Sequence, residues 1–176
     1  MFVAVWPDDG TQERLSSLRL KPAQGLRLVE PGQWHITLRF LGDVDEQLVP
    51  SLIDALGSGV RRLVVPVHCE VGPSTAWFNG DRILQIPVAG LDATAGAVRS
   101  ATIPVIPGRV RGEPQFQGHL TIARSMGRGP DVTVRTALAG LPFFSTFPVD
   151  DIHLVASHVS AEGTRYSTLE RVPLPR

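Results

Sequence analysis

The chain has 176 residues, the length of about one domain, so a core can form without disulfide staples. Its 43% apolar and 19% charged residues exclude a disordered chain, and its single cysteine, Cys69, excludes an internal disulfide framework. The formal net charge is zero, which argues against a protein that coats long nucleic acids. The apolar runs are far shorter than the ~20 residues that span a bilayer, and the start of the chain lacks signal-peptide features. We therefore expect a cytoplasmic protein with no membrane segment and, by default, a monomer.

The first half of the chain alternates strand-like and helix-like segments. Asp8 and Asp9 follow an apolar β-rich run and offer an N-cap for the first helix. The predicted elements are a strand at residues 2–6, a helix ending near Leu20, a strand holding His35, a helix over Asp45–Leu56 and a strand over Leu63–Val71.

The second half repeats this order in outline. The turn Phe78-Asn79-Gly80-Asp81 leads into it and is typical of a hairpin. The predicted elements are strands over Arg82–Pro87, around His119, over Phe147–Val159 and at about Tyr166–Val172, with helices over Leu91–Ala101 and, more weakly, Asp131–Leu141.

A short motif also occurs twice. His35-Ile36-Thr37-Leu38 and His119-Leu120-Thr121-Ile122 both read His, apolar, Thr, apolar, and the histidines lie 84 residues apart, nearly half the chain. The repeat predicts an α+β, bilobal fold made of two pseudo-symmetric βαβαβ-like halves. The repeat units run from about 2–75 and 82–172 within one domain, 1–176. Mixed or antiparallel sheets should surround a central groove, with the helices outside and a pseudo-two-fold axis relating the halves.

Two His-x-Thr strands facing one groove suggest acid–base chemistry on a phosphodiester. Side chains alternate along a strand, so each His shares a face with its Thr. Neutral imidazole can accept a proton on one side while a protonated imidazole donates one on the other. The Thr hydroxyls can donate to phosphate oxygens. By the same alternation Arg39 lies on the His35 face and is a further candidate for a phosphate contact, whereas Arg124 reaches that face only if its strand bulges near Ala123.

Other interpretations of these residues remain open. A single His in an apolar strand is usually a packed or surface residue, and a two-His metal site lacks a third ligand at defined spacing. His68, His153 and His158 lack the motif and are expected to be structural or exposed. Phe40 is expected in the core, and Cys69 as a small buried apolar residue.

The chain resembles the two-histidine phosphoesterase superfamily. The resemblance rests on His35, Thr37 and Phe40 in the first motif and on His119, Thr121 and Arg124 in the second. Within that superfamily, the start Phe2-Val3-Ala4-Val5, Phe40-Leu41-Gly42 and the late Ser157-His158 with Thr164-Arg165-Tyr166 resemble the RNA 2',3'-cyclic phosphodiesterases, also called 2'-5' RNA ligase-like. The resemblance runs from about Phe2 to Val172. One departure is Gly118, which stands where family members commonly have Pro.

The resemblance implies an enzyme that hydrolyses RNA 2',3'-cyclic phosphate ends, tRNA halves among them, to 2'-phosphates. His35 would be the general acid and His119 the general base, with Thr37, Thr121 and Arg124 holding the phosphate. No metal or other cofactor is implied, and reversible 2'-5' ligation is a side activity. Two alternatives stay open: a non-catalytic module that binds RNA ends or nucleotides, and a phosphodiesterase of the same superfamily acting on a small cyclic nucleotide.

Overall fold

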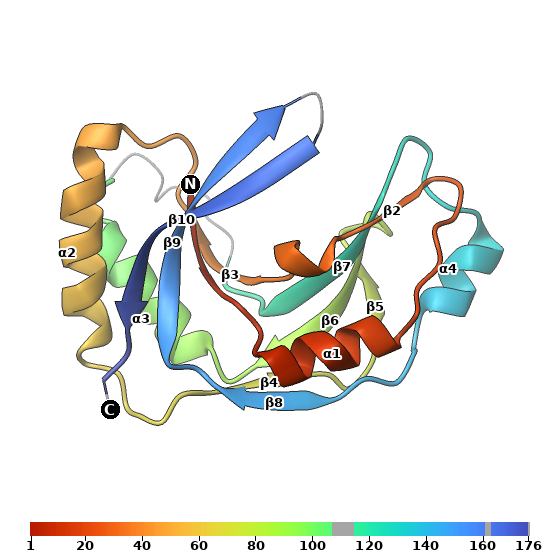
Figure 1. Ribbon diagram of the computed structural model, residues 1–176, viewed down its shortest axis with the longest axis horizontal. Helices are drawn as coiled ribbons and strands as arrows, with labels where there is room; N and C mark the ends of the chain where they lie inside the picture. Colours follow the sequence, from red (N-terminus) through yellow and green to blue (C-terminus); the bar gives the residue numbers. More distant parts are fainter. Residues whose placement is uncertain (107–114, 161–162, 176) are drawn as a thin grey trace.

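The computed structural model describes residues 1–106, 115–160 and 163–175. Within these ranges the chain forms antiparallel strands with helices at both ends of the molecule (Figure 1). The strands are β1 (Phe2–Val5), β2 (Leu26–Leu28), β3 (Ile36–Phe40), β4 (His68–Val71), β5 (Ala76–Phe78), β6 (Ile83–Ala89), β7 (His119–Ser125), β8 (Ser145–Pro148), β9 (Asp151–Ser160) and β10 (Gly163–Pro173). The helices are α1 (Asp9–Ser17), α2 (Val49–Val60), α3 (Asp92–Thr102) and α4 (Val132–Leu138), with short 3-10 turns η1 (Pro31–Gln33) and η2 (Glu46–Leu48).

The described strands form one hydrogen-bonded path in the order β10-β9-β1-β3-β7-β6-β4-β8. β2 adds to the edge of β7, and β5 adds to β6. Strand β6 pairs with two strands, since Ile83–Pro87 pair with β7 whereas Val88 and Ala89 pair with β4. The antiparallel, bilobal α+β fold expected from the repeat is therefore present, with its sheets continuous rather than separate.

A pseudo-two-fold axis passes through the centre of this path. Ile36 of β3 pairs with Leu120 of β7, and each is the residue that follows a motif histidine. On either side, β1 pairs with β3 and β6 pairs with β7. The two halves of the sequence are interleaved around this axis, because β9 and β10 lie beside β1 whereas β4 lies between β6 and β8.

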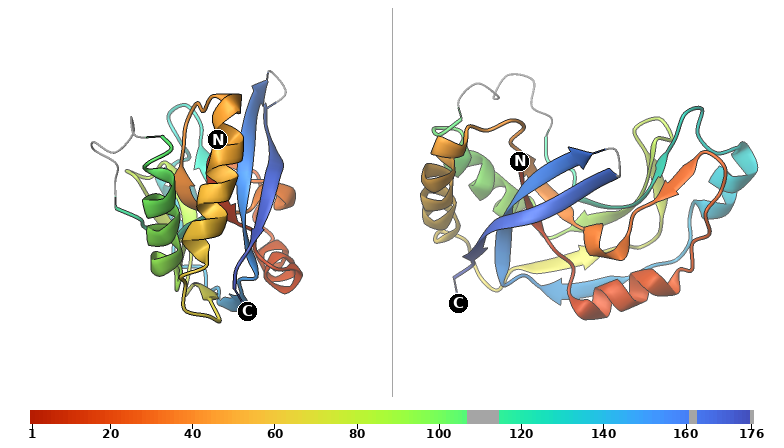
Figure 2. Two further views of the ribbon diagram at one scale, coloured as in Figure 1. Left: turned by 90° about the vertical axis from the view of Figure 1, so that its left-hand side faces the viewer. Right: turned by 45° about the horizontal axis from the view of Figure 1, so that its top comes forward.

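The helices lie against the curved sheet. α2 and α3 pack together beside the lobe that holds the chain termini, and α1 lies along β8 in the other lobe (Figures 1 and 2). The N-caps predicted from sequence are present at α1, where Asp8 Oδ1 accepts from the Thr11 amide at 2.8 Å. α2 buries Leu52, Leu56 and Val60, one face of a helix with a period of 3.6 residues.

Two strand predictions were wrong, and two short strands were not predicted. The predicted strand Leu63–Val71 begins only at His68, since Pro66 has no N–H to donate to a ladder. The predicted strand Phe147–Val159 is two strands, β8 and β9, which lie in opposite lobes with Val149 and Asp150 between them. β2 and β5, of three residues each, were not predicted because such short runs carry no periodicity.

The described residues form two apolar clusters. The main core includes Val3, Ile36, Leu84 and Leu120, all at or below 1% exposure, between the sheet and the helices. A second, smaller cluster lies on the other face of the first lobe and consists of Phe2, Ala4 and Val155, with Trp6 and Tyr166 packed against it. That second face carries His35, as the ring contacts below show.

Candidate active site

A pocket of about 540 Å³ opens beside His35. Its lining comes from four segments that are distant in the sequence: β2 with the following turn, the start of β3, β7, and the β9–β10 hairpin. The lining residues are Arg27, Leu28, Val29, Glu30, Gln33, His35, Thr121, Arg124, Ser157, Gly163, Thr164 and Tyr166.

A bulge in β7 brings Arg124 into this pocket. Gln85 pairs with Thr121 but the next partners are Leu84 and Ala123, so Ile122 is an extra residue on β7. After one extra residue, the side chain five positions beyond His119 returns to the His119 face. Arg124 therefore lines the pocket with Thr121. The sequence predicted this position for Arg124 only if its strand bulges near Ala123, and the bulge is present.

An equivalent bulge turns Arg39 away. On β3, Ala4 pairs with Thr37 and Val3 with Arg39, so Leu38 is the extra residue. The prediction that Arg39 shares the His35 face is wrong, because strict alternation fails at Leu38. Arg39 is 3% exposed and donates from Nη1 to Thr102 Oγ1 and to the Arg99 carbonyl of α3.

The same bulge moves Phe40 to the His35 side. Its ring lies 6.2 Å from that of Phe2, and the side chain is 66% exposed. The expectation of a core role for Phe40 is therefore wrong. Phe40 and Arg124 are equivalent residues, each five positions after a motif histidine and each returned to the groove by a bulge.

His35 is held with one ring nitrogen free of backbone contacts. Its Nδ1 lies 2.6 Å from the Gln33 carbonyl oxygen, which can only accept, so Nδ1 carries the proton of the neutral ring and Nε2 is the nitrogen without it. Three aromatic rings surround the imidazole: Phe2 at 5.0 Å, Tyr166 at 5.1 Å and Trp6 at 5.5 Å between centroids. Burial among them lowers the pKa of His35, and the charges of Arg124 and His119 lower it further, against the opposing hydrogen bond to Gln33.

His119 repeats this arrangement in a more open setting. Its Nδ1 lies 2.8 Å from the Gln117 carbonyl oxygen, again two residues earlier, so its Nε2 is the free nitrogen. The ring of Phe78 lies 5.3 Å away at an interplanar angle of 31°, close to the 5.0 Å and 33° of the Phe2–His35 pair. Both imidazoles are thus held by one carbonyl and one Phe ring.

The structure brings His35, Thr121 and Arg124 together on the wall of one pocket. Thr37 and His119 are not among the described lining residues; they flank the central Ile36–Leu120 pair, and His119 is near enough for its charge to act on His35. Thr121 is 8% exposed, whereas Thr37 and His119 are half-buried. The four motif residues are therefore gathered around the centre of the sheet.

Sequence reasoning missed Arg27 and Gln33 and left Tyr166 undecided. Gln33 Nε2 donates to the Thr164 carbonyl at 2.6 Å and so fastens η1 to the start of β10 across the pocket. The signal that was available is the Gln two residues before each motif histidine, Gln33 and Gln117. Arg27 carried no such signal, because it lies on the short strand β2 that the sequence did not reveal.

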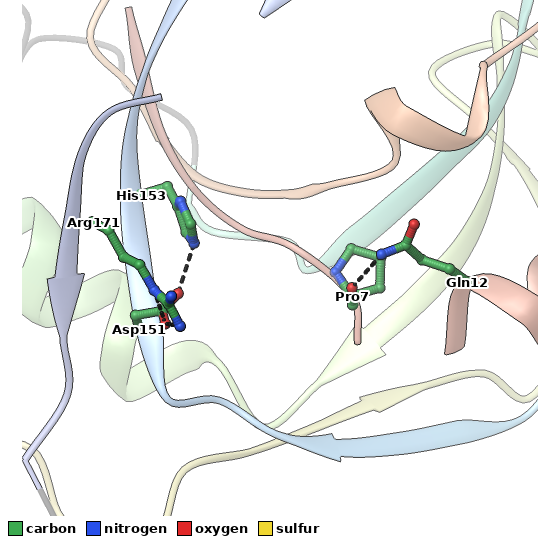
Figure 3. Close-up of polar contacts among 5 residues, drawn as sticks. All are labelled: Pro7, Gln12, Asp151, His153 and Arg171. Carbon is green, nitrogen blue, oxygen red and sulfur yellow. Dashed lines mark hydrogen bonds and ion pairs between the residues drawn. The ribbon is translucent and has the colours of Figure 1, made fainter. Parts of the chain in front are cut away.

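The remaining histidines have other surroundings. His153 Nε2 lies 2.6 Å from Asp151, which also accepts from Arg171 (Figure 3), so Asp151 serves this structural network rather than a motif histidine. In the same view Gln12 of α1 donates to the Pro7 carbonyl and fixes the end of β1 (Figure 3). His68 and His158 are exposed. Over the described ranges, no group of three or more His, Cys, Asp or Glu side chains is placed to hold a metal ion.

Comparisons with known proteins point to one family. The LigT-like phosphoesterase family model matches residues 5–65, which include the first motif. An RNA 2',3'-cyclic phosphodiesterase of Thermus thermophilus is 28% identical, the alignment covering 99% of this chain and 89% of the relative. One of the same name from Archaeoglobus fulgidus is 26% identical over 96% of this chain and 97% of the relative.

Solved structures share the fold. The crystal structure of TT0787 from Thermus thermophilus superposes with a TM-score of 0.82 at 23% identity, covering 98% of this chain and 96% of that one. Escherichia coli LigT complexed with 3'-AMP gives a TM-score of 0.75 at 20% identity, covering 99% and 97%. Among the described residues, no helix has the length and apolar character needed to cross a bilayer.

Proposed function

We propose that the chain is a LigT-like phosphoesterase and, more specifically, an RNA 2',3'-cyclic 3'-phosphodiesterase that leaves a 2'-phosphate. One observation supports this proposal above the others. Two imidazoles stand at equivalent places around the central Ile36–Leu120 pair, each with Nδ1 tied to a carbonyl and Nε2 free. A binding site for a phosphate has no need of two such titratable groups, whereas an in-line displacement at phosphorus has.

The proposed step transfers one proton on each side of the phosphorus atom. His119 Nε2 takes a proton from water as the water oxygen forms its bond to phosphorus. The bond from phosphorus to O3' breaks, and protonated His35 gives its Nε2 proton to O3'. The products are a 2'-phosphomonoester and a free 3'-hydroxyl. His119 is left protonated and His35 neutral, and exchange with solvent restores both.

The environment of His35 couples its protonation to substrate binding. Burial and the charges of Arg124 and His119 favour the neutral ring in the empty pocket. An anionic phosphodiester supplies the opposite charge, which favours the imidazolium that a general acid requires. His35 would therefore gain its proton as the substrate binds.

The remaining groups would hold the phosphate. Thr121 and Thr37, which lie on the motif strands, would donate to non-bridging oxygens, where negative charge develops. Arg124 can contact the same group through two guanidinium nitrogens. No step requires a metal or another cofactor. Reversible 2'-5' ligation, with tRNA halves as substrates, would use the same groups in the reverse direction.

The product isomer tests this function. Purified protein is incubated with a 2',3'-cyclic mononucleotide and with an oligoribonucleotide ending in a cyclic phosphate, each with and without EDTA. A 2'-phosphate formed in both conditions is the expected result. A 3'-phosphate would mean that O2' leaves and would contradict the proposal. Loss of activity in EDTA would indicate a metal, and tight binding without turnover would indicate a binding module instead.

A further inference from the structure

Two arginines of the pocket stand side by side. Arg27 of β2 and Arg124 of β7 are directly opposite in the antiparallel register, and both line the pocket. Side chains directly opposite on one face of such a pair have Cβ atoms about 5 Å apart, and like charges in that relation destabilise the sheet. The repulsion between the two guanidinium groups thus destabilises this strand pair, and an anion bound between or beside them would offset that repulsion.

No carboxylate of the described residues meets that need. Neither Arg27 nor Arg124 has a side-chain hydrogen bond or an ion pair with any described residue, and this includes Glu30, which also lines the pocket. Elsewhere on the described surface arginines do find carboxylates: Arg135 pairs with Asp81 at 2.7 Å, and Arg171 pairs with Asp151. The arginine pair of the pocket is therefore available to a ligand.

The position of the pair relative to the motif residues suggests which anion it takes. The Arg27–Arg124 pair lies four residues farther along β7 than the Ile36–Leu120 pair, or about 13 Å at ~3.3 Å per residue. Arg124 stands on the motif strand β7 together with Thr121, and its charge lowers the pKa of His35, whereas Arg27 stands on the neighbouring strand β2 at the edge of β7. Arg124 thus faces the reacting phosphate, and Arg27 faces the space beyond it.

We propose that Arg27 binds a second phosphate of the substrate, the one on the 5'-oxygen of the terminal nucleotide whose cyclic phosphate reacts beside His35. In an RNA strand this group is the phosphodiester to the preceding nucleotide. The protein would therefore prefer an oligonucleotide end over a free cyclic mononucleotide. This inference rests on the proposed function, because it takes the cyclic phosphate as the reacting group.

Three substrates distinguish recognition of the second phosphate from recognition of the preceding nucleoside. They are a 2',3'-cyclic mononucleotide with a 5'-hydroxyl, the same mononucleotide with a 5'-phosphate, and a dinucleotide that ends in the same cyclic nucleotide. The ratio of kcat/KM for each phosphate-bearing substrate to that of the 5'-hydroxyl compound is measured. In Arg27→Gln we expect this ratio to fall about tenfold or more, the scale of one charge-assisted hydrogen bond. Arg27→Lys should keep part of it.

Two further variants test whether a change in this ratio has a cause other than the loss of Arg27. Arg128→Gln removes the same charge from an exposed position outside the pocket lining and should leave the ratio at its wild-type value. Arg124→Gln should lower kcat/KM for all three substrates alike. If Arg27→Gln leaves this ratio of kcat/KM values unchanged, the second phosphate site is overturned. This holds even if the variant lowers kcat/KM equally for every substrate. If the wild-type protein hydrolyses none of the three, the proposed function has failed instead.

One outcome is that the dinucleotide alone is preferred over the 5'-hydroxyl compound, with the preference lost in Arg27→Gln. That result would mean that Arg27 recognises the phosphate of the internucleotide linkage. Equal preference for both supports recognition of the phosphate itself. If the dinucleotide preference survives Arg27→Gln, the preceding nucleoside is recognised by other residues, and the assignment of Arg27 is wrong.

Discussion

Ile36 and Leu120 are partners across the centre of the sheet, and both are fully buried. The histidines that precede them are related by the same local symmetry, yet their surroundings differ. Phe2, Trp6 and Tyr166 enclose His35, whereas the ring contacts described for His119 involve Phe78 alone. A symmetric backbone thus presents one desolvated and one more open imidazole, which is a basis for different roles in one reaction.

Loss of either motif imidazole should nearly abolish turnover. In His35→Ala and His119→Ala we expect kcat/KM on a cyclic phosphate end to fall at least ~10²-fold, the scale of one general acid or base. The exposed His68 supplies a matched control, and His68→Ala should retain wild-type activity. Near-normal turnover in either motif variant, with a native circular dichroism spectrum, would be incompatible with the assigned roles.

Arg124 should control the titration of His35. A nearby guanidinium disfavours the imidazolium and lowers the pKa of His35, so Arg124→Gln should raise this pKa toward its usual value. The pKa should still stay below that value, because burial is the larger cause and remains. NMR titration of the His35 ring measures the change, with Arg128→Gln as the control for net charge. An unchanged or lower pKa in Arg124→Gln would contradict the electrostatic contact.

Arg39 should matter for stability rather than for phosphate binding. Its buried guanidinium ties β3 to α3 through Thr102 and Arg99. Arg39→Met should lower the free energy of unfolding by about 1–3 kcal/mol, since it removes these bonds and leaves buried acceptors unmet. Arg14→Met, at an exposed position of α1, should change it by no more than about 0.5 kcal/mol. Urea denaturation compares them; an Arg39 variant of wild-type stability but weakened phosphate affinity would restore the original prediction.

Cys69 should resist modification in the native protein. The thiol is fully buried, and burial, helped by the charges of Asp8 and Glu70, raises its pKa to about 12. Because the thiolate is the reactive form, an aromatic disulfide reagent at pH 8 should label Cys69 only when the protein unfolds. Labelling followed against urea should track the circular dichroism transition. Rapid labelling in native buffer would show that β4 opens without global unfolding.

The fold could be predicted from the repeat because its strands and helices are indicated by short stretches of sequence. Runs of apolar residues mark β1 and β6, and Asp8 marks the start of α1, so these elements follow from the residues themselves. The split between β8 and β9 did not follow. The predicted strand ran through Asp150 and Asp151, but β8 pairs with β4 whereas β9 pairs with β1 and β10, so the two strands lie in opposite lobes.

The candidate site divides in the same way. The motif histidines were evident from their spacing, but the faces of Arg39 and Arg124 depend on an extra residue in each strand, at Leu38 and Ile122. A bulge is set by what both neighbouring strands must bury, which a single strand's sequence does not contain. Arg27 likewise depends on β2 pairing with a strand nearly a hundred residues away in the sequence.

The exchange of strands between the halves has a consequence for how the activity could arise during synthesis. β9 and β10 from the end of the chain support β1, and β4 from the first half lies between strands of the second. A polypeptide cut in the turn at Asn79-Gly80 would give two pieces, each carrying one motif and neither holding the strands its lobe needs. Hydrolysis should appear only after the last strand has been made, or when the two pieces are mixed and reassemble.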